Sequence, residues 1–121
     1  LCTLLFLSIE SISQSNVCTA PTAITSNSSC SFTSGTLAGS TYTAFLTPCG
    51  NSSGNRNDVW YRFTAVGNQA TITINSTGTL GGTAAPRFQI TDNNCTSPTT
   101  VYCSNNNIGT VTGLSNGTQY L

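Results

Sequence analysis

The stretch Asp58-Val59-Trp60-Tyr61-Arg62-Phe63-Thr64-Ala65 decides the fold class of this chain. Successive side chains of an extended chain point to opposite faces, so apolar residues at every second position favour a half-buried strand. One face of the stretch carries Val59, Tyr61 and Phe63, and the other carries Trp60 and Arg62. We therefore predict a β-strand over residues 58–65, with its aromatic side chains divided between two faces.

The same period-two pattern recurs along the chain between clusters of Gly, Asn, Ser and Pro. Residues 70–75 form the next clear strand, and Val66-Gly67-Asn68-Gln69 predicts a hairpin-like turn that joins it to the first. Weaker strands are expected at residues 31–37, 41–46, 87–91, 100–103, 110–114 and from Gln119 onward. Short strands at this spacing predict an all-β, two-sheet antiparallel β-sandwich of the jelly-roll type.

The composition excludes several functions. Charged residues make up 5% of the 121 residues, where a soluble domain carries about 25%, and there is no His. Without a basic stripe, nucleic-acid binding is not expected, and without His there are no Ser-His or Cys-His nucleophile pairs and no imidazole metal ligands. The composition favours a non-catalytic binding or structural module. An enzyme would depend on Asp58, Asp92, Tyr and Arg, for instance through a pair of carboxylates of the glycosidase kind.

The first nine residues are the only strongly apolar run, and Ser11, Ser13 and Ser15 follow it. This pattern is typical of a secretory signal peptide without its start, with cleavage before either Gln14 or Asn16. A buried strand or short helix is the alternative, and the run is too short to span a membrane. We therefore expect residues 1–15 to be a signal peptide and residues 16–121 to form one domain.

The segment from Leu114 to Tyr120 has a Leu, an Asn-Gly turn and a Tyr at the start of the next strand. This spacing predicts a tyrosine corner, in which the Tyr hydroxyl bonds to backbone a few residues upstream. Since the sequence given ends at Leu121, we expect the sandwich to be truncated in its last strand.

Seven features follow one another in a fixed order and together resemble a known family. They are Asn16-Val17-Cys18, Cys30 with the Gly35-Thr36-Leu37-Ala38-Gly39 segment, Cys49, residues 58–65, Cys95, Cys103, and residues 114–120. This series resembles the cysteine-containing β-sandwich modules of secreted Bacteroidetes-type proteins, similar to the bacterial pre-peptidase C-terminal (PPC) domain. The resemblance implies an accessory module without catalytic residues of its own, attached to other domains of a secreted or cell-surface protein.

The resemblance also implies a disulfide pairing. It suggests bridges from Cys30 to Cys49 and from Cys95 to Cys103, and leaves Cys18 unpaired, with its partner expected beyond Leu121. A site with four cysteine ligands for a metal is the alternative, but the close C-x-x-C pairs that such sites commonly use are absent.

Five residues are expected to have structural roles: Asp58, Trp60, Tyr61, Phe63 and Tyr120. Trp60 is expected in the core; the alternative is an exposed platform, with Tyr61 or Tyr102, on which a sugar ring could stack. Asp58 is expected to accept backbone N–H groups of a turn, and the alternative is a weak calcium site with loop carbonyls. No other cofactor and no metal site is expected.

The sequence thus predicts a secreted, non-catalytic module that serves adhesion, substrate docking or spacing. Its partners would be other domains of the same polypeptide and extracellular polysaccharide or protein. The alternative is a carbohydrate-binding module that uses exposed aromatic side chains.

Overall fold

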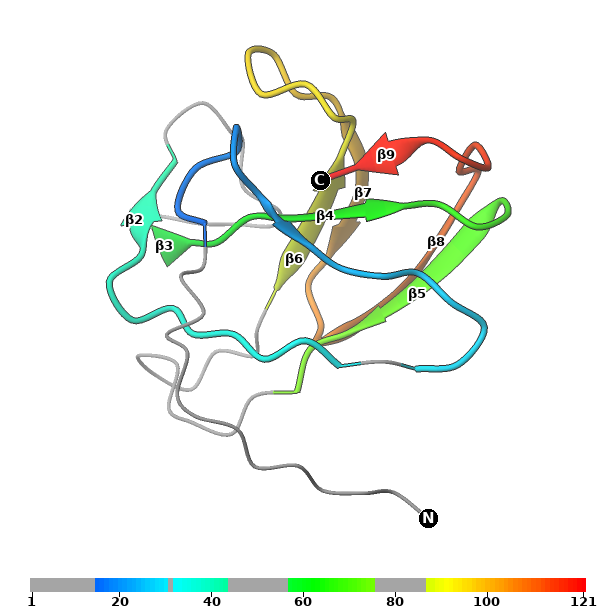
Figure 1. Ribbon diagram of the computed structural model, residues 1–121, viewed down its shortest axis with the longest axis horizontal. Helices are drawn as coiled ribbons and strands as arrows, with labels where there is room; N and C mark the ends of the chain where they lie inside the picture. The colour runs from blue at the N-terminus through cyan, green and yellow to red at the C-terminus, as the bar shows by residue number, and fades with distance from the viewer. Residues whose placement is uncertain (1–14, 31, 44–56, 76–86) are drawn as a thin grey trace.

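The computed structural model describes residues 15–30, 32–43, 57–75 and 87–121 and is all-β (Figure 1). These residues form nine strands and no helix, which confirms the predicted all-β class. The strands are β1 (Thr22–Ala23), β2 (Thr41–Tyr42), β3 (Asn57–Asp58), β4 (Tyr61–Thr64), β5 (Gln69–Thr73), β6 (Phe88–Thr91), β7 (Thr100–Ser104), β8 (Ile108–Thr112) and β9 (Gln119–Tyr120). Apart from Ser15, the predicted signal peptide lies outside the described residues.

Five strands form the main layer. β4 lies between β1, which is parallel to it, and β9, which is antiparallel. The β6–β7 pair joins this sheet because Thr91 and Leu121 exchange two backbone hydrogen bonds of 2.8 and 3.1 Å. β5 and β8 pair separately over five residues, and β2 pairs with β3.

The predicted hairpin between residues 58–65 and 70–75 is wrong. β4 pairs with β1 and β9, whereas β5 pairs with β8, so the chain leaves one sheet after β4 and enters another at β5. The chain makes the matching passage between β8 and β9. Residues 66–68 do separate two strands, as predicted. The two strands are neighbours in the sequence, but they do not pair with each other.

The two passages between sheets are bonded to each other. Ala65 donates from its backbone N–H to the Thr118 carbonyl over 2.9 Å and accepts from Gly117 over 2.8 Å. The backbone N–H of Gly67, which has a φ of 95°, donates to the Asn116 side-chain oxygen over 2.9 Å. We call this pair of connections, residues 65–68 and 113–118, the double corner.

Tyr120 closes the double corner. Its hydroxyl accepts a 3.0 Å hydrogen bond from the Ser115 backbone N–H, which is the arrangement of a tyrosine corner, and its ring stacks on Phe63 with centroids 5.7 Å apart. The ring is buried at the end of β9. The bond therefore ties β9, which follows the double corner, back to Ser115 inside it.

Replacing Tyr120 with Phe is expected to lower the free energy of unfolding by about 1–2 kcal/mol, because the Ser115 N–H loses its partner in a part-buried position. Urea denaturation measures this effect. Tyr42→Phe is the matched control: its hydroxyl has no hydrogen bond to the described residues, and a change within about 0.5 kcal/mol is expected there. Equal losses in the two variants would contradict the assignment.

Apolar side chains pack on both faces of the main layer. The larger cluster lies between the main layer and the β5–β8 pair and consists of Phe63, Ala65, Ile90, Val111, Leu114 and Tyr120. The smaller cluster consists of Cys18, Trp60 and Leu121, with Cys95 packed against it. Because neighbouring strand residues point to opposite faces, Tyr120 and Leu121 belong to different clusters. Both faces of β4 are thus covered, which explains why Trp60 and Phe63 are both buried.

Thr91 lies fully buried at the end of β6, where the register with β7 shifts after Ile90. Its side-chain hydroxyl has no hydrogen-bond partner within the described ranges. Valine has the same shape without the hydroxyl, so Thr91→Val is expected to stabilise the fold by about 1 kcal/mol, measured as a higher urea midpoint. Thr112→Val on the exposed face of β8 is the control, and a loss of stability in Thr91→Val would refute the prediction.

Two expectations for the N-terminal third need correction. Residues 32–37 form no strand: Phe32 is exposed, and a turn follows in which Ser40 donates to the Leu37 carbonyl over 3.1 Å. Conversely, β1 was not predicted, because two residues are too short for a periodic pattern. β1 is held by hydrogen bonds from Thr22 and Ile24 to carbonyls of Trp60 and Arg62.

Candidate functional site

The N-terminal segment, residues 15–20, crosses the outer face of the main layer beside Trp60. The backbone N–H of Trp60 donates to the Ser15 carbonyl over 2.9 Å, and Ala20 donates to the Val17 carbonyl to close a turn. The segment is anchored by a disulfide between Cys18 and Cys95, whose Cα atoms lie 5.6 Å apart. This bond joins the segment to the loop that follows β6.

The disulfide corrects the expected pairing. Cys18 is bonded to Cys95, so the predicted Cys95–Cys103 bridge and the unpaired Cys18 are both wrong. Cys30 carries an exposed free thiol, which excludes the Cys30–Cys49 bridge, and Cys103 is disulfide-bonded to a residue other than Cys95. Cys49 lies outside the described residues. Spacing misled here because pairing depends on which strands lie together, and the segment before β1 runs beside β4 and the end of β6.

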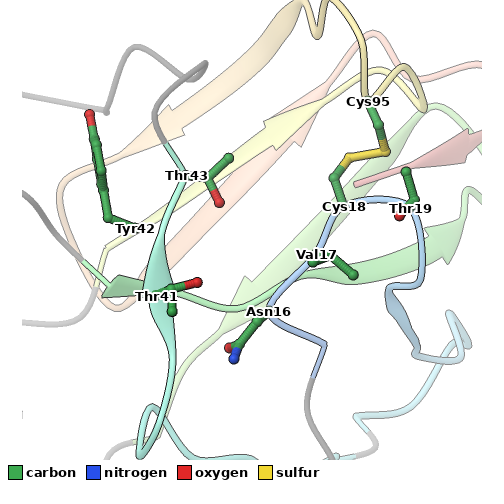
Figure 2. A pocket seen from close by; sticks show the side chains of 8 residues that line it. All are labelled: Asn16, Val17, Cys18, Thr19, Thr41, Tyr42, Thr43 and Cys95. Atoms are coloured by element: carbon green, nitrogen blue, oxygen red, sulfur yellow. A yellow bond between two sulfur atoms is a disulfide. The ribbon is translucent and has the colours of Figure 1, made fainter.

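A cavity of about 360 Å³ lies between the N-terminal segment and β2 (Figure 2). We call it the disulfide pocket. It is lined by Asn16, Val17, Cys18, Thr19, Thr41, Tyr42, Thr43 and Cys95. All of these side chains are uncharged at neutral pH, and the polar groups among them are hydroxyls and one amide. Its volume falls in the range of small-molecule sites, about 300–1,000 Å³.

The side chains on β2 divide between the two sides of the strand. Thr41 and Thr43 point toward the N-terminal segment, whereas the ring of Tyr42 points to the other side (Figure 2). The amide nitrogen of Asn16 donates to the Gly39 carbonyl over 3.1 Å, which ties the segment to the turn before β2. Two walls from distant parts of the chain are therefore held facing each other.

A hydrogen-bonded chain fixes the wall at Thr43. The two carboxylate oxygens of Asp58 accept the Thr43 backbone N–H over 2.9 Å and its hydroxyl over 2.8 Å. The Thr43 hydroxyl in turn accepts from the indole nitrogen of Trp60 over 3.3 Å. Both oxygens of Asp58 thus bond across the β2–β3 pair to the residue that follows β2.

The other candidate carboxylate serves a separate loop. Asp92 accepts the Thr99 backbone N–H over 2.9 Å, and Asn94 accepts backbone N–H groups of Thr96 and Ser97 over 3.0 and 3.2 Å. Within the described ranges, no three residues of His, Cys, Asp or Glu gather as a metal-binding group. The two carboxylates therefore bond to different segments, Asp58 to the residue after β2 and Asp92 to the loop between β6 and β7.

The aromatic candidates are placed as follows. Trp60 is 6% exposed and belongs to the smaller cluster, so it cannot serve as an exposed platform. Tyr102 is half-buried and packs on Phe88, with ring centroids 6.0 Å apart, while Tyr61 is half-buried on β4. A surface built on Trp60 with Tyr61 or Tyr102 is not present.

The sequence did not indicate three of the pocket residues as ligand-binding residues: Asn16, Thr41 and Thr43. Thr and Asn are so frequent in this chain that the sequence alone does not distinguish a Thr or Asn in a binding site from one elsewhere. Comparison of the chain with protein-family models, curated proteins and solved structures finds no match. Within the described residues, no helix has the length and apolar character that crossing a membrane requires.

Proposed function

We propose that this chain is a non-catalytic docking module of a secreted or cell-surface protein, and that it binds extracellular material through the disulfide pocket. The observation that carries the proposal is the pocket itself, an open hollow whose described lining residues are uncharged and whose walls are anchored by a disulfide and by the Asp58–Thr43–Trp60 chain. Disulfides persist mainly in oxidising compartments, which supports secretion. The resemblance to PPC modules supports an accessory role beside other domains.

Binding is favoured over catalysis because the two candidate carboxylates bond to separate segments of the chain, Asp58 to Thr43 and Asp92 to Thr99. Both oxygens of Asp58 accept hydrogen bonds from Thr43, and Asp92 accepts one from Thr99. A glycosidase needs two carboxylates facing one bond, with an acid and a base role divided between them. In this chain each of the two carboxylates bonds to its own segment, and none of the hydrogen bonds is shared between them.

The test is retention on insoluble extracellular material. The full chain is labelled with a maleimide dye on the Cys30 thiol and sedimented with cellulose, chitin, collagen and bacterial cell walls. We expect retention on at least one material, with loss after reduction of the disulfides. Retention on none of them contradicts docking, and hydrolysis of a retained polymer that disappears in Asp58→Asn or Asp92→Asn contradicts the non-catalytic role.

A further inference from the structure

The disulfide pocket presents hydrogen-bonding groups that the protein does not use itself. The hydroxyls of Thr19 and Thr41 make no hydrogen bond to any described residue, and Asn16 uses its amide N–H group toward Gly39 while its side-chain oxygen stays open. Hydroxyls both donate and accept, and the amide oxygen accepts. A matching ligand must therefore offer both donors and acceptors.

The same pocket has apolar surface between these groups. Val17 is 53% exposed, and the Cys18–Cys95 disulfide and the threonine methyl groups complete the apolar part of the lining. A purely polar ligand such as a free ion would leave this surface in water. A ligand with C–H faces and hydroxyl edges would cover it.

Charge narrows the ligand class further. The Asp58 carboxylate is bonded to Thr43 behind the pocket wall and is not among the lining residues, and none of the described residues that line the cavity carries a charge. An anionic or cationic ligand would lose hydration without contacting a counter-charge among the described lining residues, and a hydrocarbon would leave the hydroxyls unpaired. We propose that the disulfide pocket binds an uncharged saccharide through Asn16, Thr19 and Thr41, an inference that rests on the proposed docking function.

A single fluorophore lies behind the wall of the pocket. Trp60 is the only Trp in the sequence, and its indole nitrogen bonds to Thr43 in the pocket wall. A ligand that contacts this wall changes the surroundings of a single fluorophore. Trp60 emission therefore reports occupancy without a label.

The experiment is a titration of the full, oxidised chain with glucose, galactose, mannose, N-acetylglucosamine and their β-linked oligomers, followed by Trp60 emission and by calorimetry. We expect saturable binding of at least one neutral sugar. Thr41→Val keeps the side-chain shape but removes the hydroxyl, so its affinity should fall about tenfold. Thr110→Val is the matched control: Thr110 is exposed on β8 outside the pocket, and its variant should bind as the original chain does.

The outcomes separate this inference from the proposed function. Absence of both heat and emission change with every neutral sugar, or equal losses in Thr41→Val and Thr110→Val, overturns the saccharide assignment. Tighter binding of glucuronic acid or glucosamine than of their neutral counterparts overturns it as well. If the chain is nevertheless retained on insoluble material, docking stands and only the ligand class is refuted; if retention fails too, both are refuted.

Discussion

Removing the Cys18–Cys95 disulfide, by changing both cysteines to Ala, is expected to lower the free energy of unfolding by about 4 kcal/mol. The bond joins residues 77 positions apart, and constraining so long a loop removes much conformational entropy from the unfolded chain. It also holds Cys18 and Cys95 in the cluster with Trp60 and Leu121. Guanidinium denaturation without a reducing agent measures the loss.

Cys30→Ala is the matched control for this prediction. Cys30 is exposed and carries a free thiol, so its replacement should change stability by no more than about 0.5 kcal/mol. Trp60 emission should shift toward that of an exposed indole in the double variant at denaturant concentrations where the control remains folded. An unchanged midpoint in the double variant would show that the cross-link does not stabilise the fold.

Replacing Gly109 with Ala is expected to cost up to about 3 kcal/mol, because the added methyl group overpacks the space under Tyr102. A Cβ at this position would lie 2.6 Å from the Tyr102 hydroxyl oxygen, 2.8 Å from its Cε1 and 3.0 Å from the Phe88 Cζ. The Tyr102 ring thus covers a glycine in β8 and fills the place of its missing side chain. Denaturant midpoints of purified variants measure the cost.

A double-mutant cycle identifies the cause. In Tyr102→Leu the atoms closest to the new methyl group are gone, so Gly109→Ala should be at least about 1 kcal/mol less costly in that background. Additive losses in the double variant would contradict steric conflict and would indicate that the backbone of β8 itself requires glycine.

The sequence predicted those parts of the fold that depend on neighbouring residues. Alternation in residues 58–65 and 87–91 located β4 and β6, and the Leu114–Tyr120 spacing located the turn that Tyr120 closes. The sequence did not predict which strands pair, because pairing depends on segments that are far apart in the chain. β4 and β5 are adjacent in the chain, yet each pairs with a strand from the C-terminal third: β4 with β9, and β5 with β8.

The candidate site shows the same division. Asp58 directly before the aromatic stretch predicted a carboxylate that accepts backbone N–H groups of a turn; it accepts the backbone N–H of Thr43, which follows β2, across the β2–β3 pair. The pocket itself could not be predicted, because Asn16 and Thr41 belong to segments that only the folded topology brings together. The disulfide was mispredicted for the same reason, since Cys18 meets Cys95 across the outer face of the sheet.

The double corner has a consequence for the order of events during folding. Its two connections are hydrogen-bonded to each other, so neither can adopt its final conformation until residues about fifty positions apart are in contact. Contacts between residues so far apart in the sequence form slowly. Cys18 and Cys95 approach each other only where β4, β9 and the end of β6 are already side by side. We therefore expect the Cys18–Cys95 disulfide to form late in folding, after the sheet has assembled. Its formation would then stabilise a topology that already exists and would not direct the chain toward it.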